Sequence, residues 1–218
     1  MTPATLVIGN KGYSSWSFRP WMVMKEFAIP FQEEVVPLYR ENSKAKLLTH
    51  SSAGKVPVLI HDGLHVWDSL AIIEYLAERY PALPIWPRKI EARAHARALA
   101  AEMHAGFTAL RKECPTNFRR KTSPVSLSEA ASADLSRIDA AWREARARFG
   151  EGGPFLYGAF SAADAMFAPV VNRVEIYGLP VSPDSRTFVE AVKNLASWKS
   201  WHAGAQEEEW RLPQFELA

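Results

Sequence analysis

Hydrophobic and polar positions alternate between strand and helix patterns over the first 80 residues. The run Thr5–Ile8 is short, apolar and followed at once by Gly9 and Asn10, which is typical of a buried strand. Two apolar runs flank Asp62-Gly63 and indicate a hairpin. The expected order is strand 5–8, helix 16–28, strand 31–37, helix 43–50, strands 56–60 and 64–67, and a helix from residue 68.

From residue 88 onward the spacing of apolar residues predicts helices only. One apolar stripe runs to Cys114 and is closed by Pro115, and a capping-box pattern over 126–129 precedes a second stripe that ends near Phe149. A second capping box, over 161–164, opens a helix to Ile176, and shorter helices are expected at 184–195 and 197–208. The prolines of 81–87 mark a linker, so we expect two domains, 1–81 and 88–218.

Composition narrows the class of protein. The 218 residues are 48% hydrophobic and 23% charged, which is typical of a globular chain. The single cysteine excludes an internal disulfide and a cysteine-based zinc cluster, and it fits a reducing compartment. The formal net charge of +2 gives no nucleic-acid footprint, and the basic run Arg119–Lys121 is interpreted as a solvated loop. No apolar run is long enough to span a membrane and no signal peptide is evident, so we expect a soluble cytoplasmic protein without membrane or nucleic-acid partners.

A serine-rich turn follows the first strand. Tyr13, Ser14 and Ser15 lie where a helix is expected to begin. Serines at this position cap free N–H groups, and a helix N-terminus also favours anions. A ligand thiolate held there would be stabilised by both effects, although ordinary capping explains the serines equally.

Two further short segments carry candidate chemistry. Pro57 either simply opens a strand or forms a cis bond after Val56, which would present the Val56 backbone to an extended ligand. Asp68 and Ser69 precede an amphipathic helix. They are either N-caps or, with the local N–H groups, a binding site for a ligand carboxylate.

Taken in order, these features resemble the cytosolic glutathione S-transferases over essentially the whole chain. Val56-Pro57 looks like the cis-proline motif of that family, the segment 68–76 like its glutathione segment, and 161–164 like its buried N-capping box. The resemblance implies a thioredoxin-like α/β N-terminal domain followed by an all-α C-terminal domain. It also implies that the protein forms a homodimer.

The serine motif is most similar to that of the zeta class and suggests a bacterial member. The segment 14–19 reads Ser-Ser-Trp-Ser-Phe-Arg, where the zeta pattern is Ser-Ser-Cys-Ser-x-Arg. Trp16 replaces the cysteine and cannot form a mixed disulfide with glutathione, which disfavours thiol-exchange chemistry. Lys55 and Asp68 stand where zeta members usually have glutamine.

The resemblance implies that glutathione binds as an extended co-substrate, without a metal. The glutathione cysteine would pair with Val56 across Pro57, and the γ-glutamyl group would meet Ser69 and Asp68. Lys55, together with Asn42, would meet the other charged end of glutathione. Ser15 is the predicted donor to the glutathione thiol and Ser14 is its support, with Tyr13 as a competing donor.

The electrophile would bind between the domains. The candidate walls are Tyr13, Arg19, His104, Phe107, Arg111 and Arg119. His104, Phe107 and Arg111 are expected to share one helix face. For Phe107 a core position and for His104 a surface position are the alternatives. Cys114 is interpreted as a small buried residue rather than a nucleophile.

The predicted function is a glutathione transferase that uses a serine to hold the glutathione thiol as thiolate for attack on an electrophile. Two alternatives stay open. One is a maleylacetoacetate- or maleylpyruvate-type isomerase of the zeta kind. The other is a non-catalytic module that binds glutathione or a protein, because a fold does not fix a function.

Overall fold

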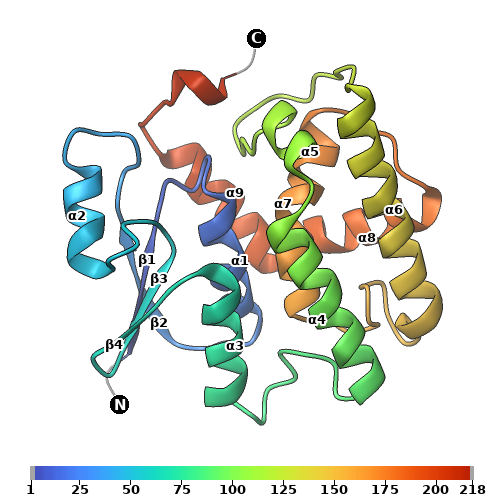
Figure 1. The fold of residues 1–218 in the computed structure, drawn as a ribbon, viewed down its shortest axis with the longest axis horizontal. Coiled ribbons are helices and arrows are strands. Elements are labelled where there is room, and N and C mark those ends of the chain that lie inside the picture. The colour runs from blue at the N-terminus through green and yellow to red at the C-terminus, as the bar shows by residue number, and fades with distance from the viewer. Residues whose placement is uncertain (1–2, 217–218) are drawn as a thin grey trace.

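The computed structural model describes residues 3–216 as a four-stranded sheet with helices on both faces, beside a larger group of helices (Figure 1). The outermost positions of the two predicted domains, 1–2 and 217–218, lie outside the described residues. The α/β part comes first in the chain and the remaining elements are helical, as the sequence predicts.

The sheet has the strand order β2-β1-β3-β4 and mixes parallel and antiparallel pairs. β1 pairs with β2 in parallel, and β3 is antiparallel to both β1 and β4. Asp62 and Gly63 form the predicted hairpin turn, and both have positive φ, of 49° and 79°. The strands are β1 (Ala4–Ile8), β2 (Phe31–Val35), β3 (Val58–His61) and β4 (Leu64–Val66).

Helices cover the two faces of the sheet unequally. The helices α1 (Ser15–Glu26) and α3 (Ser69–Arg79) lie on the face toward the helical part, and α2 (Ser43–His50) lies on the other face (Figure 1). Side chains alternate along β1, so Leu6 joins the main core while Val7 joins a small cluster with Leu47 of α2. The carboxyl end of β1 therefore leads directly into the start of α1.

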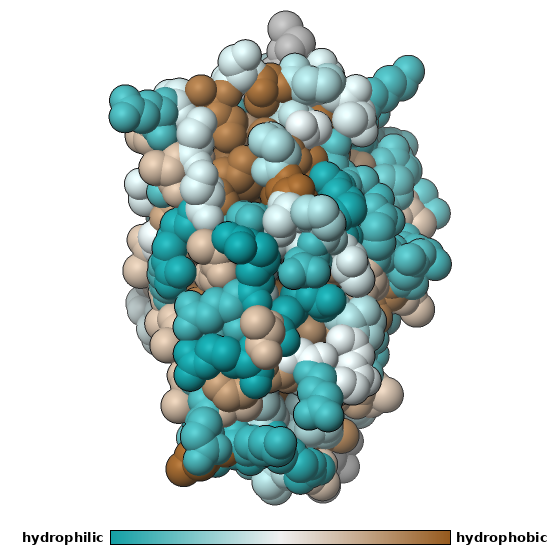
Figure 2. Space-filling model, turned by 90° about the vertical axis from the view of Figure 1, so that its right-hand side faces the viewer, coloured by the Kyte–Doolittle hydropathy of each residue, from teal (hydrophilic) through white to brown (hydrophobic). Residues whose placement is uncertain are grey.

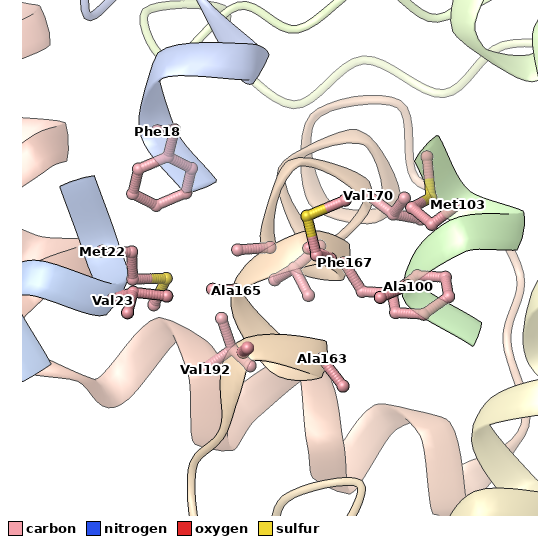
Figure 3. Close-up of a cluster of buried hydrophobic side chains, with 14 of the residues drawn as sticks. Phe18, Met22, Val23, Ala100, Met103, Ala163, Ala165, Phe167, Val170 and Val192 are labelled. Atoms are coloured by element: carbon pink, nitrogen blue, oxygen red, sulfur yellow. The ribbon is translucent and has the colours of Figure 1, made fainter. Parts of the chain in front are cut away.

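The helical part is organised around α7, whose side chains are almost all buried. Figure 3 shows Met22 and Val23 of α1 and Met103 of α4 facing residues of α7 such as Phe167. α7 therefore joins the two parts of the chain into one core. The elements are α4 (Ile90–Ala105), α5 (Thr108–Glu113), α6 (Glu129–Phe149), α7 (Ala162–Ile176), α8 (Pro183–Asn194), α9 (Ala196–Glu207) and the short helix η1 (Pro213–Phe215).

The single helix predicted up to Cys114 is wrong. α4 ends before Gly106, and Phe107 adopts a left-handed conformation with φ 57° before α5 begins. Glycine is a poor helix former, and it interrupts a stripe whose apolar spacing continues through the break. His104 and Phe107 therefore do not share one helix face with Arg111.

The two predicted capping boxes have different outcomes. At α6 the cap is Ser128 rather than Ser126, because the Ser128 hydroxyl accepts the Ala131 N–H at 3.2 Å. At α7 the predicted box is present, and the Asp164 carboxylate accepts the Ser161 N–H at 2.7 Å. The Asp164 carboxylate also accepts the Leu156 N–H at 2.9 Å, so it ties the preceding loop to the helix.

Aromatic side chains attach α9 to α1. Phe18 and Trp21 contact Trp201, with ring centroids 4.9 and 5.0 Å apart, so this C-terminal tryptophan packs on the first part of the chain. Trp198 joins the same cluster through Phe18. Trp210 has a different role, because its backbone carbonyl accepts a hydrogen bond from Arg119.

Hydrophilic residues dominate the face on the helical side, with hydrophobic residues gathered in one area toward the top (Figure 2). Among residues 3–216, no helix is both long and apolar enough to cross a bilayer.

Candidate active site

A cavity of about 630 Å³ lies where the start of α1 meets the helical part of the chain. Ser14 and Ser15 line it from one side and Arg111 and Arg173 from the other. A second cavity of about 420 Å³ extends toward the start of α3. Trp16, Lys55 and Val56 line both cavities, which therefore adjoin.

The two serines at the start of α1 differ in their hydrogen bonds. Ser14 is 6% exposed and is the N-cap of α1; its hydroxyl donates to the Ser17 hydroxyl at 2.8 Å. Ser15 is half-buried, and its hydroxyl has no partner among the described residues. The Ser15 hydroxyl is therefore free to donate to a ligand in the cavity, whereas the Ser14 proton is already used.

The turn that holds these serines is fixed from two directions. The Ser17 hydroxyl accepts the Gly9 N–H at 3.1 Å. Glu208, which follows α9, accepts the N–H groups of Lys11 at 2.5 Å and Gly12 at 3.0 Å. Burial raises the pKa of the Glu208 carboxyl, which these backbone donors oppose. Sequence reasoning missed Glu208, because no local pattern links it to a turn almost 200 residues earlier.

Val56 offers an unpaired backbone to the site. The bond between Val56 and Pro57 is cis, which is one of the two alternatives that the sequence left open. Val56 precedes β3 and makes no backbone hydrogen bond to another described residue. Since Val56 lines both cavities, its N–H and carbonyl are available to an extended ligand.

The start of α3 contains an unsatisfied hydroxyl. Ser69 is fully buried and lines the second cavity, and its hydroxyl has no hydrogen-bond partner. Ser69 is the first residue of α3, where free N–H groups favour an anion. Asp68 is the N-cap and accepts the N–H groups of Leu70 at 3.0 Å and Ala71 at 3.2 Å. Asp68 therefore caps the helix, and the Ser69 hydroxyl is not used for capping.

Asp68 also connects the two parts of the chain. Its carboxylate lies 2.8 Å from Nε2 of His104, at the end of α4. His104 lines the second cavity, beside Ser69, and not the first. The structure therefore places His104 on the side of Asp68 and Ser69, away from the predicted electrophile pocket.

Two predicted walls of the electrophile pocket are buried in the core. Arg19 is 1% exposed; its Nε donates to the Met166 carbonyl at 3.1 Å, and it lines neither of these two cavities. Phe107 is 8% exposed and also lines neither. The left-handed turn at Phe107 directs this residue into the core, so the shared face predicted for it does not form. Arg111, by contrast, lines the first cavity.

The hydroxyl of Tyr13 is occupied by the C-terminal segment. It accepts hydrogen bonds from Arg119 at 2.7 Å and from the Leu212 N–H at 3.2 Å, and it donates to Glu216. The Tyr13 ring lines the first cavity, but this competing donor is not free for a thiol. Arg119 lines neither cavity and is not a solvated loop residue, because it also donates to the Glu208 and Trp210 carbonyls.

Basic residues gather at the outer end of the first cavity. Lys55 is exposed there and is joined by Arg40 and Lys44, which sequence reasoning missed. Lys44 Nζ donates to the Gly54 carbonyl at 3.3 Å. Asn42 is exposed and lines neither cavity.

Cys114 is buried at the end of α5, and burial raises the pKa of its thiol to about 11. The thiol therefore stays protonated at neutral pH, in keeping with a packing role rather than a nucleophilic one.

Comparison with known proteins agrees with this geometry. The family model of the glutathione S-transferase N-terminal domain matches residues 13–79, and that of the C-terminal domain matches residues 128–198. A crystal structure of a glutathione transferase homolog from Burkholderia, with bound glutathione, is 27% identical, with a TM-score of 0.72, and the match covers 95% of this chain and 100% of that one.

Two curated relatives point the same way. A probable maleylacetoacetate isomerase from Caenorhabditis elegans is 38% identical over 96 residues, which is 44% of each chain. Glutathione S-transferase theta-1 from Mus musculus is 28% identical over 187 residues, which covers 82% of this chain and 74% of the mouse protein. The chain spans about half the length of several of the curated relatives that it matches. Matched in both halves by the models of one family, and over nearly its whole length by the Burkholderia structure, the chain belongs to the glutathione S-transferase family.

Proposed function

We propose that the protein is a glutathione transferase in which Ser15 stabilises the glutathione thiolate for attack on an electrophile. The observation that carries this proposal is the free hydroxyl of Ser15, which lies at the N-terminus of α1 and opens into the larger cavity. Its neighbour Ser14 already donates to Ser17 and is the structural member of the pair.

The binding mode of glutathione follows from the unsatisfied groups along the two cavities. The γ-glutamyl carboxylate binds the buried hydroxyl and the N–H of Ser69, because Asp68 already accepts the next two N–H groups of α3. The cysteine backbone pairs with Val56 beside Pro57. The glycine carboxylate lies among Lys55 and Lys44 at the outer end of the larger cavity. The thiol then lies near Ser15.

The energetics of this mechanism are modest. A free thiol titrates at about pH 8.5, and lowering that pKa by about two units requires roughly 2.7 kcal/mol of preferential stabilisation of the thiolate. A hydrogen bond from a hydroxyl to a charged group contributes about 1.5–3 kcal/mol. One serine at a helix N-terminus is therefore sufficient, without a metal.

Two measurements on the purified protein test this function. The protein should bind glutathione in a calorimetric titration and should conjugate it to a chlorodinitrobenzene with release of chloride. Binding without turnover of any electrophile would favour the non-catalytic module. Failure to bind glutathione would contradict the proposal.

The nematode relative favours a second candidate function, because that protein is a probable maleylacetoacetate isomerase. In such a reaction the thiolate would add to a double bond, allow rotation and then leave again. Trp16, which stands where the zeta pattern has cysteine, separates this chain from that pattern. Turnover of maleylacetone without turnover of aryl halides would favour the isomerase.

We also propose that the protein acts in the cytoplasm as a homodimer, with residues 1–81 binding glutathione and residues 88–218 forming most of the electrophile pocket. Large apolar side chains support an interface, because Trp67 is 45% exposed and Ile90 is 65% exposed. Light scattering should give the mass of two chains.

A further inference from the structure

Arginines of three helices lie close together near Trp16, two of them against its ring and the third in the same cavity wall. Arg19 comes from α1, Arg111 from α5 and Arg173 from α7. The Trp16 ring centroid lies 4.1 Å from the guanidinium carbon of Arg19 and 5.2 Å from that of Arg111. Arg19 and Arg173 are 1% and 3% exposed, so two of the three charges are removed from bulk water.

These charges have no acidic counterpart at contact distance. Arg173 donates to the carbonyls of Cys114 at 2.7 Å and Pro169 at 3.1 Å, and Arg111 donates to the His104 carbonyl at 3.3 Å. Nη1 of Arg19 is buried without any partner. Within residues 3–216, no carboxylate forms an ion pair with any of the three guanidinium groups. The charges of Asp68 and Asp134 act on Arg19 and Arg111 without forming an ion pair with them. Buried charge without a contacting counter-ion is unfavourable, so these arginines form a positive centre that an anion would stabilise.

Arg173 keeps its charge at neutral pH. Burial, together with the neighbouring charge of Arg111, lowers the pKa of Arg173 to about 10. Burial and the charges of Arg173 and Arg111 lower the pKa of Arg19. The pKa of Arg173 still lies well above neutrality, so this residue remains a cation where an anionic ligand would meet it.

The positive centre opens into the same cavity as the serines. Arg111 and Arg173 line this cavity together with Thr116, which is 4% exposed. The Thr116 hydroxyl is buried without a hydrogen-bond partner. Two arginines and a threonine with an unpaired hydroxyl therefore line the same space as Ser15.

The anion that would bind Arg111 and Arg173 must belong to the second substrate, the electrophile. This step rests on the proposed function, in which the two glutathione carboxylates bind at Ser69 and at Lys55. Arg111 and Arg173 are then left for a different anion. A carboxylate suits them best, because its two oxygens match the planar fork of a guanidinium group.

We propose that Arg111, Arg173 and Thr116 form a carboxylate subsite, and that the electrophile of this enzyme carries a carboxylate in addition to its reactive carbon. Arg19 reinforces the positive field from behind Trp16. The subsite holds the anionic end of the electrophile while its reactive carbon faces the thiolate beside Ser15.

A matched pair of substrates tests the subsite. The probes are para-chloro-meta-nitrobenzoate and its methyl ester. In both, the glutathione thiolate forms a carbon–sulfur bond at the carbon that bears chlorine, the carbon–chlorine bond breaks and chloride leaves with the electron pair. The thiol proton has already passed to solvent, so atoms and electrons balance without a further reactant. The two probes differ only in the negative charge that the subsite is proposed to bind and in ring activation, which cancels when enzyme variants are compared.

The variant is Arg111→Gln. The ratio of kcat/KM for the acid to kcat/KM for the ester should fall about 10- to 100-fold, the range that a charge-assisted hydrogen bond contributes. Arg111→Lys should lose less, because it keeps the charge without the fork. The matched control is Arg143→Gln, at an exposed arginine of α6 that pairs with Asp139, and it should leave the ratio unchanged.

A binding measurement on the unmodified protein keeps the proposal testable if Arg111→Gln does not fold. Para-nitrobenzoate should compete with the ester at least about tenfold more strongly than para-nitrobenzamide, which lacks the charge. Equal inhibition, or an acid-to-ester ratio that Arg111→Gln leaves unchanged, would overturn the subsite while conjugation of the ester upholds the proposed function. If the unmodified protein conjugates the chlorodinitrobenzene but neither probe, the subsite is overturned and the proposed function stands; if it conjugates none of the three, the proposed function is overturned as well.

Discussion

At the scale of single residues, Ser14 and Ser15 are neighbours with different roles. The Ser14 hydroxyl donates to Ser17 and accepts the Ser17 N–H at 3.4 Å, so it serves the turn. The Ser15 hydroxyl makes no such bond and lies in the wall of the larger cavity. One serine is thus required by the fold of the turn, and the other is available for chemistry.

Replacing each serine with alanine should separate these roles. Ser14→Ala should lower the free energy of unfolding by about 1 kcal/mol, the usual effect of losing an N-cap. Ser15→Ala should change it by less than about 0.5 kcal/mol, yet lower turnover of a chlorodinitrobenzene by about tenfold or more. Denaturant titrations and initial rates on the same preparations measure both quantities. A large loss of stability with unchanged turnover in Ser15→Ala would assign this serine to the turn instead.

The sequence alone identifies residues whose position depends only on the residues next to them in the chain. Ser15, Val56 and Ser69 could be found because each lies in a short motif at the start of a helix or strand. Arg173 and Thr116 could not, because they reach the cavity only after α7 has docked on the rest of the molecule. Arg19 was misplaced for the same reason: its motif gives its helix, whereas its burial depends on the contact with Met166 of α7.

At the scale of elements, the start of α7 depends on one buried carboxyl. Burial raises the pKa of Asp164 from 3.8 to about 6, although the N–H groups of Leu156 and Ser161 oppose the shift. A carboxyl whose pKa is raised on folding contributes most stability while it is protonated in both states. That contribution should decline as the pH rises from about 4 to about 6, by up to about 3 kcal/mol.

Asp164→Asn provides the reference, because asparagine keeps one acceptor oxygen and does not titrate. The free energy of unfolding of the unmodified protein, minus that of Asp164→Asn, should decrease over this pH interval and then level off. Urea titrations at several pH values measure the difference and cancel the other titrating groups. A difference that grows with pH would show that the hydrogen bonds from Leu156 and Ser161 hold the pKa of Asp164 below its ordinary value.

Strands and helices with one clear pattern are predictable from the sequence, and those with mixed patterns are not. The hairpin at Asp62-Gly63 was found because its turn requires positive φ at both residues. The helix around Cys114 was misjudged because Leu110 continues the apolar stripe of α4 across the break at Gly106. The apolar residues of α4 and α5 can pack onto the same core although the helix is interrupted between them, so their spacing does not reveal the break.

At the scale of the whole molecule, α7 makes the α/β part and the helical part depend on each other. Met22 of α1 is fully buried in the cluster that α7 shares with α4 (Figure 3). Removal of a side chain from such a cluster leaves a cavity as well as losing apolar burial. A destabilising substitution in α1 should therefore lower the stability of the entire chain.

Met22→Ala should lower the free energy of unfolding by about 2–5 kcal/mol in a single transition. Tryptophan fluorescence, to which Trp21 in α1 and Trp142 in α6 contribute, should show the same unfolding midpoint as circular dichroism. Leu48→Ala is the matched control, because Leu48 is 49% exposed and its truncation should have little effect. Two separate transitions, of which only one shifts, would contradict a shared core.

Closure of the site by the C-terminal segment is a property of the whole molecule that no local pattern predicts. Glu208 holds the Lys11–Gly12 turn, and Asn117 donates to the Phe215 carbonyl at 3.3 Å. These contacts join residues about 100 to 200 positions apart. The wall that they form beside Tyr13 is therefore visible only in the folded chain.

The most direct test of the account is the titration of glutathione bound to the protein, followed by the ultraviolet absorbance of the thiolate. In the unmodified protein the bound thiol should titrate at about pH 6.5, two units below the free thiol. In Ser15→Ala it should return most of the way toward about pH 8.5 while glutathione remains bound. A bound thiol that titrates at the same pH in both proteins would contradict the central claim that Ser15 stabilises the thiolate.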